Sequence, residues 1–403
     1  MTAPYSALFK PGLPTPAQKW TGWPVFNFVG GHNDEGSIPV DALRAAMDRV
    51  LVKEGPTLAT YHLQSGPLGY LPLRSYLVDK LKAYSGIKCD TDEILLTSGS
   101  LQALDLVNGL FLEAGDTVIV EESNYGGIFS KLNALSVNMI TVSVDQDGMN
   151  IDDLESKLAD CEGKSIRPKF IYTIPTVHNP TGTIMTLERR LRLIEIAKAK
   201  LIPIFEDECY ADLIWDGERP PALRGLDDSG LVVYVGSFSK CIAPALRVGF
   251  ILADWPVIAQ ILPMKGDAGS GALEQMLLAE FCPEHFDTHI MNLRKTLENK
   301  LDVLIGALEE NFGTEAGFER PPGGIFLWVK LPEAVDSTRL ATVAAENGVE
   351  INPGRGWSLG SDAGNWIRIC YANPTHETIK QGVANLAQIS RDEFGHPKFI
   401  ANR

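Results

Sequence analysis

The sequence predicts an α/β protein in which helices flank a large, mostly parallel mixed sheet, with a smaller α+β domain attached. Between residues 90 and 255, short apolar runs alternate with helical patterns, which is typical of parallel sheets built from βαβ units. Polar and glycine-rich motifs directly follow the apolar runs, at the edge where such sheets bind ligands. The 403 residues are enough for two or three packed domains with a substantial core.

The composition excludes several classes of function. Apolar residues make up 45% and charged residues 22% of the chain, which are ordinary values for a globular enzyme. The formal net charge is -15, which argues against a nucleic-acid binder and a membrane-surface protein. No apolar run approaches the length of a membrane span, and the first 19 residues lack the pattern of a signal peptide.

Cysteine usage fits an intracellular protein. The six cysteines are scattered, without C-x-x-C pairs or metal-ligand spacing, and we expect reduced, buried thiols and no metal site. They are Cys89, Cys161, Cys209, Cys241, Cys282 and Cys370. A cytoplasmic location follows as the expected one.

The N-terminal residues predict an arm, a short strand and a helix. Prolines within residues 1–25 forbid a continuous helix and favour an extended arm. The run Val25–Val29 reads as a strand that ends in the pair Gly30-Gly31, where glycine permits a tight turn or close approach to a ligand. Asp41 then opens a periodic helix through Leu51.

The alternating pattern begins with a loop and a helix that starts near Leu71. The next strand, Ile94–Thr97, runs into Ser98-Gly99-Ser100 and a helix. Small residues that open a helix leave N–H groups free to bind an anion, although such a sequence is also a common N-cap. Further strands are predicted at 117–120, 139–142, 170–175, 201–205, 231–236 and 248–252, with helices at 151–158 and 186–200.

A long helix, residues 289–310, is predicted to join the larger domain to the smaller one. Three apolar segments follow it, at 323–329, 349–354 and 365–371. We therefore expect an N-terminal arm and part of the small domain at 1–52, a large domain at 53–290 and a small domain at 291–403.

The stretch Ser237-Phe238-Ser239-Lys240 carries the chemistry. It follows a buried strand, an unusual place for a solvated amine, and lysine forms imines when it is desolvated or lies near positive charge. Arg247 supplies such a charge and, with the two serines, can grip a phosphate. A lysine that forms an imine beside a phosphate cradle describes the anchoring of pyridoxal 5′-phosphate.

Four motifs in this order resemble those of the fold-type I pyridoxal phosphate enzymes, specifically the class I/II aminotransferases. They are Asn179-Pro180-x-Gly182, Asp207-x-x-Tyr210, Ser237-x-Ser239-Lys240 with Arg247, and Arg368. The resemblance extends from about residue 25 to residue 390. It is strongest to the branch with 2-aminoadipate, aromatic and kynurenine-type aminotransferases.

The resemblance implies a role for each motif residue. Lys240 is expected to form the Schiff base and to transfer the proton, with Asp207 on the ring nitrogen and Tyr210 and Asn179 on the phenolate oxygen. Tyr125 is expected against the ring face. Arg368 clamps the substrate carboxylate, although a structural salt bridge is the alternative without the resemblance, and Gly31 lies beside the substrate with Asn179. The implied phosphate-binding residues are Ser98, Gly99, Ser100, Leu101, Ser237, Ser239 and Arg247; at Leu101 the family often has glutamine.

The expected activity is transfer of an amino group from an amino acid to a 2-oxo acid, with 2-oxoglutarate as the expected acceptor. The expected kinetics are ping-pong, and a homodimer is implied because this family builds its site at a dimer interface. The same cofactor site also supports lyase, decarboxylase or oxidase chemistry. A related domain serves in transcription regulators, but the acidic charge and the short arm before the first motif disfavour that reading.

One departure from the family concerns Ser65. Many members have a tyrosine there that reaches the cofactor phosphate of the neighbouring subunit. Two alternatives remain open: the space is vacated, which we favour, or Tyr61 or Tyr70 supplies the hydroxyl. The candidate substrate-pocket residues are His32, Asn33, Ser65, Arg355 and Trp357.

Overall fold

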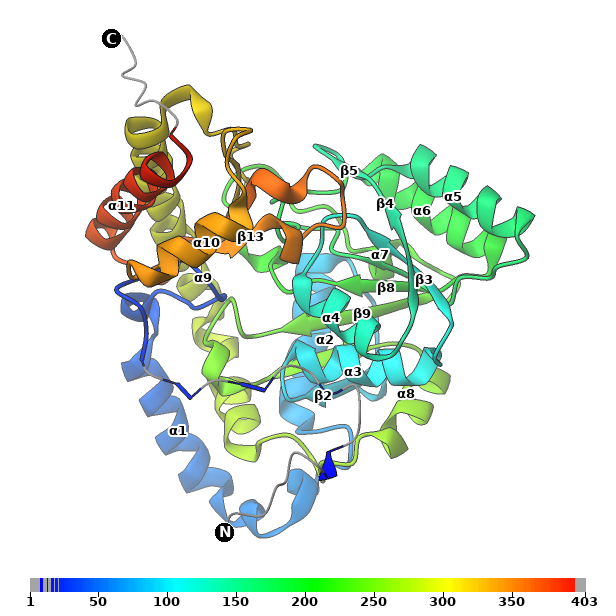
Figure 1. Ribbon diagram of the computed structural model, residues 1–403. Helices are drawn as coiled ribbons and strands as arrows, with labels where there is room; N and C mark the ends of the chain where they lie inside the picture. Colours follow the sequence, from blue (N-terminus) through cyan, green and yellow to red (C-terminus); the bar gives the residue numbers. More distant parts are fainter. Residues whose placement is uncertain (1–7, 10–12, 14–15, 18, 21, 396–403) are drawn as a thin grey trace.

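The computed structural model describes residues 8–9, 13, 16–17, 19–20 and 22–395 (Figure 1). Most of the expected arm, residues 1–25, therefore lies outside the described residues. Among the described helices, none is long and apolar enough to cross a membrane. All six cysteines are free thiols; four are buried as expected, whereas Cys89 and Cys209 are only partly buried.

A seven-stranded sheet forms the centre of the protein. Its strands, in spatial order, are β2 (Ile94–Thr97), β10 (Gly249–Leu252), β9 (Val232–Ser237), β8 (Ile204–Asp207), β7 (Ile171–Thr173), β3 (Thr117–Glu121) and β4 (Asn138–Val142). Strand β10 is antiparallel to both of its neighbours, whereas the pairs from β9 to β4 are parallel. The predicted mostly parallel sheet is confirmed.

Helices cover both faces of this sheet, because its strands are apolar on both sides. On β3, Val118 and Val120 face one cluster of buried side chains and Ile119 faces the other. Helices α5 (Ile151–Gly163) and α6 (Leu187–Lys200) cover the Ile119 face and lie side by side in Figure 1. Helices α3 (Ser100–Phe111) and α4 (Gly126–Ala134) contribute buried side chains to the opposite face.

The strand before Asp207 lies further along the chain than the predicted 201–205. Leu201 ends α6 in the left-handed conformation, with φ 51°, so the chain becomes extended only at Ile204. As a result, Asp207 is the last residue of β8 and lies within the sheet.

The long helix begins earlier than predicted. Helix α9 spans Ala272–Phe312, 41 residues, and includes Pro283. Proline removes one helical hydrogen bond and usually ends a helix. Packing overrides this local cost, because buried residues occur on both sides of Pro283, from Met276 to Leu308. Figure 1 shows α9 alongside α1 (Val40–Glu54), and α2 (Leu71–Ser85) and α11 (His376–Phe394) also contact it.

A second, three-stranded antiparallel sheet lies near the C-terminus. It contains β11 (Phe326–Lys330), β14 (Trp366–Cys370) and β13 (Asn352–Pro353). Helix α10 (Ser337–Glu346) contacts β13 and α11. Strand β1 (Phe26–Asn27) pairs with β12 (Val349–Glu350). This pairing brings Gly30 and Gly31, which follow β1, next to the C-terminal part of the chain.

Candidate active site

A cavity of about 130 Å³ opens at the carboxyl edge of the seven-stranded sheet. Ten predicted cofactor residues line it: Ser100, Leu101, Tyr125, Asn179, Asp207, Tyr210, Ser237, Ser239, Lys240 and Arg247. Apart from Arg247, they follow or end β2, β9, β8, β7 and β3, since the carboxyl ends of strands that run in the same direction meet at one edge. Ile174, Cys209 and Pro244 complete the lining.

One end of the cavity is built to hold an anion. Helix α3 begins there, and its free N–H groups favour negative charge. The Arg247 guanidinium lies beside this helix N-terminus. Its Nη1 lies 3.5 Å from Ser239 Oγ, and its Nη2 donates to Ser98 O at 3.0 Å. Gly99 has φ 76°, and an added Cβ would lie 2.2 Å from Arg247 Nη2. Ser98 and Gly99 thus position Arg247 and are not among the lining residues.

Lys240 is the lysine among the residues that line the cavity. Its Nζ donates to Gly31 O at 2.6 Å, and burial lowers the pKa of the amine below the ordinary lysine value. Two side chains fix the backbone that follows Lys240. Asn33 Nδ2 donates to Ile242 O at 3.2 Å, and His289 Nε2 lies 2.7 Å from Cys241 O. A buried amine with a lowered pKa is suited to nucleophilic and general-base chemistry.

Asp207 is the one acid of the Glu206-Asp207-Glu208 run that lines the cavity. Successive strand residues face opposite sides, and Glu206 instead accepts hydrogen bonds from Leu223 N and Arg224 N. Asp207 Oδ2 accepts a 2.8 Å hydrogen bond from Tyr172, whereas Oδ1 is buried and has no partner. Burial raises the pKa of this carboxyl.

Arg368 is a buried guanidinium held between two aromatic faces. Its Cζ lies 3.4 Å from the ring centroid of Trp357 and 3.8 Å from that of Phe326. Nη1 donates to Asn179 Oδ1 at 3.1 Å and Nη2 donates to Gly30 O at 2.9 Å, while Nε is buried without a partner. Burial lowers the pKa of Arg368 to about 10, so the charge persists at neutral pH. No carboxylate of the described residues forms a salt bridge with it, which argues against the structural alternative.

The aromatic residues complete the cavity wall. Asn179 Nδ2 donates to Tyr210 Oη at 3.2 Å and so connects Arg368 with Tyr210. The Tyr125 ring is tilted against Trp357, with centroids 5.9 Å apart. Both Tyr125 and Asn179 follow residues that bond the buried Glu121 carboxylate, namely Asn124 Nδ2 at 3.0 Å and His178 Nε2 at 3.1 Å.

The candidate substrate-pocket residues lie in different surroundings. Trp357 and Asn33 contact Arg368 and the Lys240 loop, as described above. His32 packs edge-on against Trp23 at 4.9 Å, and its pKa is lowered by burial and by the Lys240 charge. Arg355 lies near Gly364, since a Cβ there would be 2.9 Å from its Nη2.

Ser65 does not line the cavity around Lys240. Its hydroxyl donates to Leu63 O at 3.3 Å, and its carbonyl accepts a 3.1 Å bond from the buried Arg74. The preceding residues His62, Leu63 and Gln64 all have positive φ, between 49° and 65°. Non-glycine residues rarely adopt this conformation.

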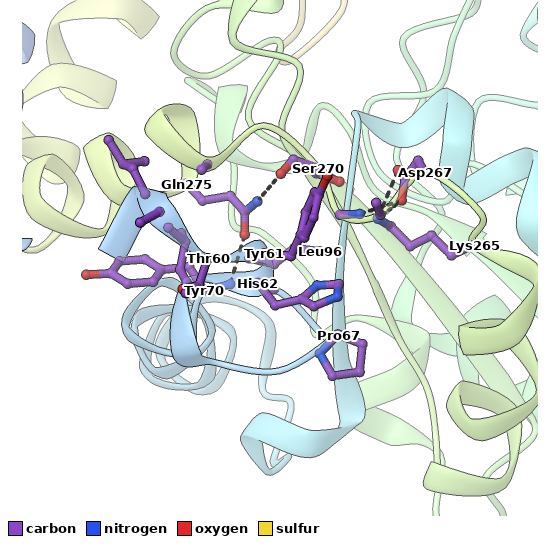
Figure 2. A pocket seen from close by; sticks show the side chains of 17 residues that line it. Thr60, Tyr61, His62, Pro67, Tyr70, Leu96, Lys265, Asp267, Ser270 and Gln275 are labelled. Carbon is purple, nitrogen blue, oxygen red and sulfur yellow. Dashed lines mark hydrogen bonds and ion pairs between the residues drawn. The ribbon is translucent and has the colours of Figure 1, made fainter. Parts of the chain in front are cut away.

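A second cavity of about 480 Å³ adjoins the Ser65 loop (Figure 2). Gln275 bridges its wall: it accepts from Tyr70 N at 2.8 Å and donates to Ser270 O at 2.9 Å. The Tyr70 hydroxyl is bound to Glu54 Oε2 at 2.5 Å, whereas Tyr61 is 81% exposed. Tyr61 and Tyr70 were the two candidates to supply a hydroxyl to the partner's phosphate. Among the described residues, the Tyr70 hydroxyl already has a partner, whereas no hydrogen bond holds the Tyr61 hydroxyl.

Sequence reasoning missed several residues around the site. Cys209 is one of the two unspecified positions of the Asp207-x-x-Tyr210 motif, and its place in that motif could have predicted that it lines the cavity. Tyr172, Glu121 and Phe326 had no signal of their own, because their positions depend on which strands are neighbours.

Comparison with known proteins agrees with this geometry. Residues 25–386 match the family model described as aminotransferase class I and II. Aromatic-amino-acid aminotransferase 1 of Thermococcus litoralis is 31% identical, over 92% of this chain and 89% of that protein. The 2-aminoadipate transaminase of Thermus thermophilus is 31% identical, over 90% and 89%. The crystal structure of Pyrococcus horikoshii kynurenine aminotransferase with PMP superposes with TM-score 0.85, at 30% identity over 91% of each chain.

Proposed function

The chain belongs to the class I and II aminotransferase family and is a pyridoxal phosphate-dependent aminotransferase, and we propose that the cavity around Lys240 is its cofactor and substrate site. The observation that carries this proposal is Asp207 Oδ1. It is buried and has no partner, and its residue lines the same cavity as Lys240. An unpaired buried carboxylate oxygen is costly unless a ligand donor meets it.

The residues present fit the cofactor. The α3 N-terminus, Ser100, Ser237, Ser239 and Arg247 would hold the phosphate. Asp207 would face the ring nitrogen, Asn179 and Tyr210 the phenolate oxygen, and Tyr125 the ring face. When bound, the cofactor supplies a carbonyl group and a ring that accepts electrons.

Lys240 performs the proton transfer in this proposal. Its Nζ, with a lowered pKa, takes the proton from the substrate α-carbon and returns it at the next step as a general acid. The Gly31 carbonyl, 2.6 Å away, holds the amine in the cavity. Gly31 and Gly30 therefore act through their backbone: one contacts Lys240 and the other Arg368.

Arg368 binds the substrate α-carboxylate in this proposal. The rings of Trp357 and Phe326 stack on the Arg368 guanidinium and fix its plane. A substrate carboxylate can then approach in that plane and form two parallel hydrogen bonds.

We expect Arg368→Lys to raise KM for amino- and oxo-acid substrates about 10- to 100-fold with a smaller change in kcat, because a point charge cannot replace a planar fork. Steady-state kinetics at fixed cofactor saturation measures this. Arg192→Lys is the matched control, since exposed Arg192 pairs with Glu155 and Glu195, and it should leave KM unchanged. An unchanged KM in Arg368→Lys would remove this residue from the carboxylate site.

The proposed reaction is ping-pong, with an amino acid as donor and 2-oxoglutarate as acceptor. The similar proteins named for aromatic amino acids, 2-aminoadipate and kynurenine support a donor with a large side chain. The test is a panel of amino acids added to the holoenzyme without acceptor. A stoichiometric oxo acid with conversion of the cofactor to pyridoxamine phosphate supports transamination, whereas ammonia or an amine with regenerated pyridoxal phosphate favours the lyase or decarboxylase alternative.

We further propose a cytoplasmic homodimer divided as the sequence predicts, at residues 1–52, 53–290 and 291–403. Exposed apolar side chains near the Ser65 loop support the dimer: Leu58, Tyr61 and Leu71 are 41%, 81% and 44% exposed. A subunit interface would cover such a patch. Light scattering of the purified protein tests this, and a monomer at micromolar concentration would contradict it.

In this dimer, we expect Ser65→Tyr to slow the loss of cofactor on dialysis and to lower the rate with a large aromatic donor several-fold. A tyrosine hydroxyl adds a charge-assisted bond to a phosphate and fills the vacated space. Alanine as donor should be affected less. The matched variant Tyr61→Phe decides the alternative, because faster cofactor loss there means that Tyr61 already supplies the hydroxyl. Unchanged behaviour of both variants would place this loop away from the partner's site.

A further inference from the structure

Tyr172 and Asp207 lie on neighbouring parallel strands. Tyr172 on β7 is paired with Phe205 on β8, and Asp207 lies two residues beyond Phe205. Because strand side chains alternate, Phe205 and Asp207 share a face, and a long side chain at 172 reaches the diagonal position. The Tyr172 hydroxyl donates to Asp207 Oδ2 at 2.8 Å, and both residues are buried.

The Tyr172 ring is fixed by its packing. It meets Phe205 edge-on, with centroids 5.2 Å apart and an interplanar angle of 89°. Phe205 in turn meets Phe170 at 5.8 Å and 81°. These contacts hold the hydroxyl in one direction, toward the carboxylate.

We propose that Tyr172 is a positioning residue for Asp207: its phenol occupies Oδ2, so that Oδ1 alone faces the cavity to receive the ring nitrogen of pyridoxal phosphate. This inference rests on the proposed role of Asp207 in the aminotransferase reaction. A carboxylate free to rotate would present either oxygen, at varying distance, and the phenol removes that freedom.

The surroundings of Asp207 favour a hydrogen-bond donor at its carboxylate. Burial raises the pKa of Asp207, and the nearby Glu121 carboxylate raises it further. Nearby Cys209, through its side chain and backbone, and the Tyr172 phenol lower it; of these groups, the phenol makes the 2.8 Å hydrogen bond, to Oδ2. Burial also raises the pKa of Tyr172 well above its usual range, so this phenol keeps its proton and remains a donor. Without it, a buried carboxylate loses one of few groups that favour its charged form.

The test is Tyr172→Phe, which removes the hydroxyl and keeps the ring. We expect the apoenzyme to bind pyridoxamine phosphate about 10- to 100-fold more weakly by equilibrium dialysis, the effect of one charge-assisted hydrogen bond, with a similar loss in kcat/KM. In an Asp207→Ala background, the same substitution should change the affinity less than about twofold, because the coupling exists only when both partners are present.

Tyr371→Phe is the matched control, since the Tyr371 hydroxyl is also buried but has no partner; it should leave the affinity unchanged. Equal losses for Tyr172→Phe in both backgrounds would show a merely structural role and overturn the inference. An unchanged affinity in the wild-type background, with a cooperative thermal transition retained, would also overturn it. If Asp207→Ala itself had no effect on affinity, the proposed role of Asp207 would fail as well.

Discussion

Lys240→Ala is expected to lower turnover by about 10⁴-fold or more. Its Nζ is the only amine among the residues that line the cavity, and the variant loses general acid–base catalysis, worth about 10²–10⁴-fold, together with covalent attachment of the cofactor. Steady-state turnover measures the first effect. Mass spectrometry after borohydride treatment measures the second, and it should find the cofactor on wild-type protein at Lys240 and none on the variant.

The matched control is Lys200→Ala, which changes an exposed lysine paired with Glu162. It should retain full turnover and cofactor attachment. Near-normal turnover in Lys240→Ala, or borohydride trapping at another lysine, would move the active centre away from Lys240.

The same variant should also change how the stability of the apoenzyme depends on pH. Burial lowers the pKa of Lys240 below the ordinary 10.5, so at pH values between these two the unfolded chain binds a proton that the folded chain does not. The free energy of unfolding therefore rises with pH across that window in the wild type. Denaturant titrations at several pH values should show a shallower rise in Lys240→Ala; identical slopes would contradict a depressed pKa.

Asp207→Asn is expected to retain pyridoxal phosphate through its covalent attachment to Lys240 and to lower kcat about 10²- to 10³-fold. An amide cannot balance a positive ring nitrogen, and one preorganised electrostatic contact in a dry site is worth about that factor. The Oδ1 atom that lacks a partner is the one expected to make this contact. Single-turnover kinetics with a cofactor-saturated enzyme separates this effect from weaker cofactor binding.

Glu206→Gln provides the comparison, because Glu206 is a buried acid one residue away that bonds Leu223 N and Arg224 N. Its loss should lower the thermal stability and leave kcat nearly unchanged. If both variants lost kcat to the same degree, the rate effect would come from strain in β8 rather than from Asp207 itself.

Much of the site could be predicted because it depends on local order along the chain. Tyr125, Asn179, Asp207 and Lys240 each lie at or just after a β-branched apolar run. In a parallel sheet, such positions gather at one edge regardless of the exact strand order. The resemblance to the family then assigned each residue a role, and ten of the predicted cofactor residues do line one cavity.

Strand bounds and helix bounds were less predictable. The sequence pattern placed the helix start near residue 289, yet α9 begins at Ala272 and passes through Pro283, although proline normally ends a helix. The gain from packing along α1, α2 and α11 outweighs one lost hydrogen bond, and no local pattern reports that gain.

By itself, therefore, the sequence determined the mostly parallel sheet, its carboxyl edge and ten of the residues that line one cavity there. Only the tertiary structure decided that Tyr172 holds Asp207 Oδ2, that Trp357 and Phe326 enclose Arg368, and that Glu54 occupies the Tyr70 hydroxyl. Each of these contacts joins residues from separate elements. Their formation depends on strand register and helix packing, which sum weak interactions across the whole chain rather than within one segment.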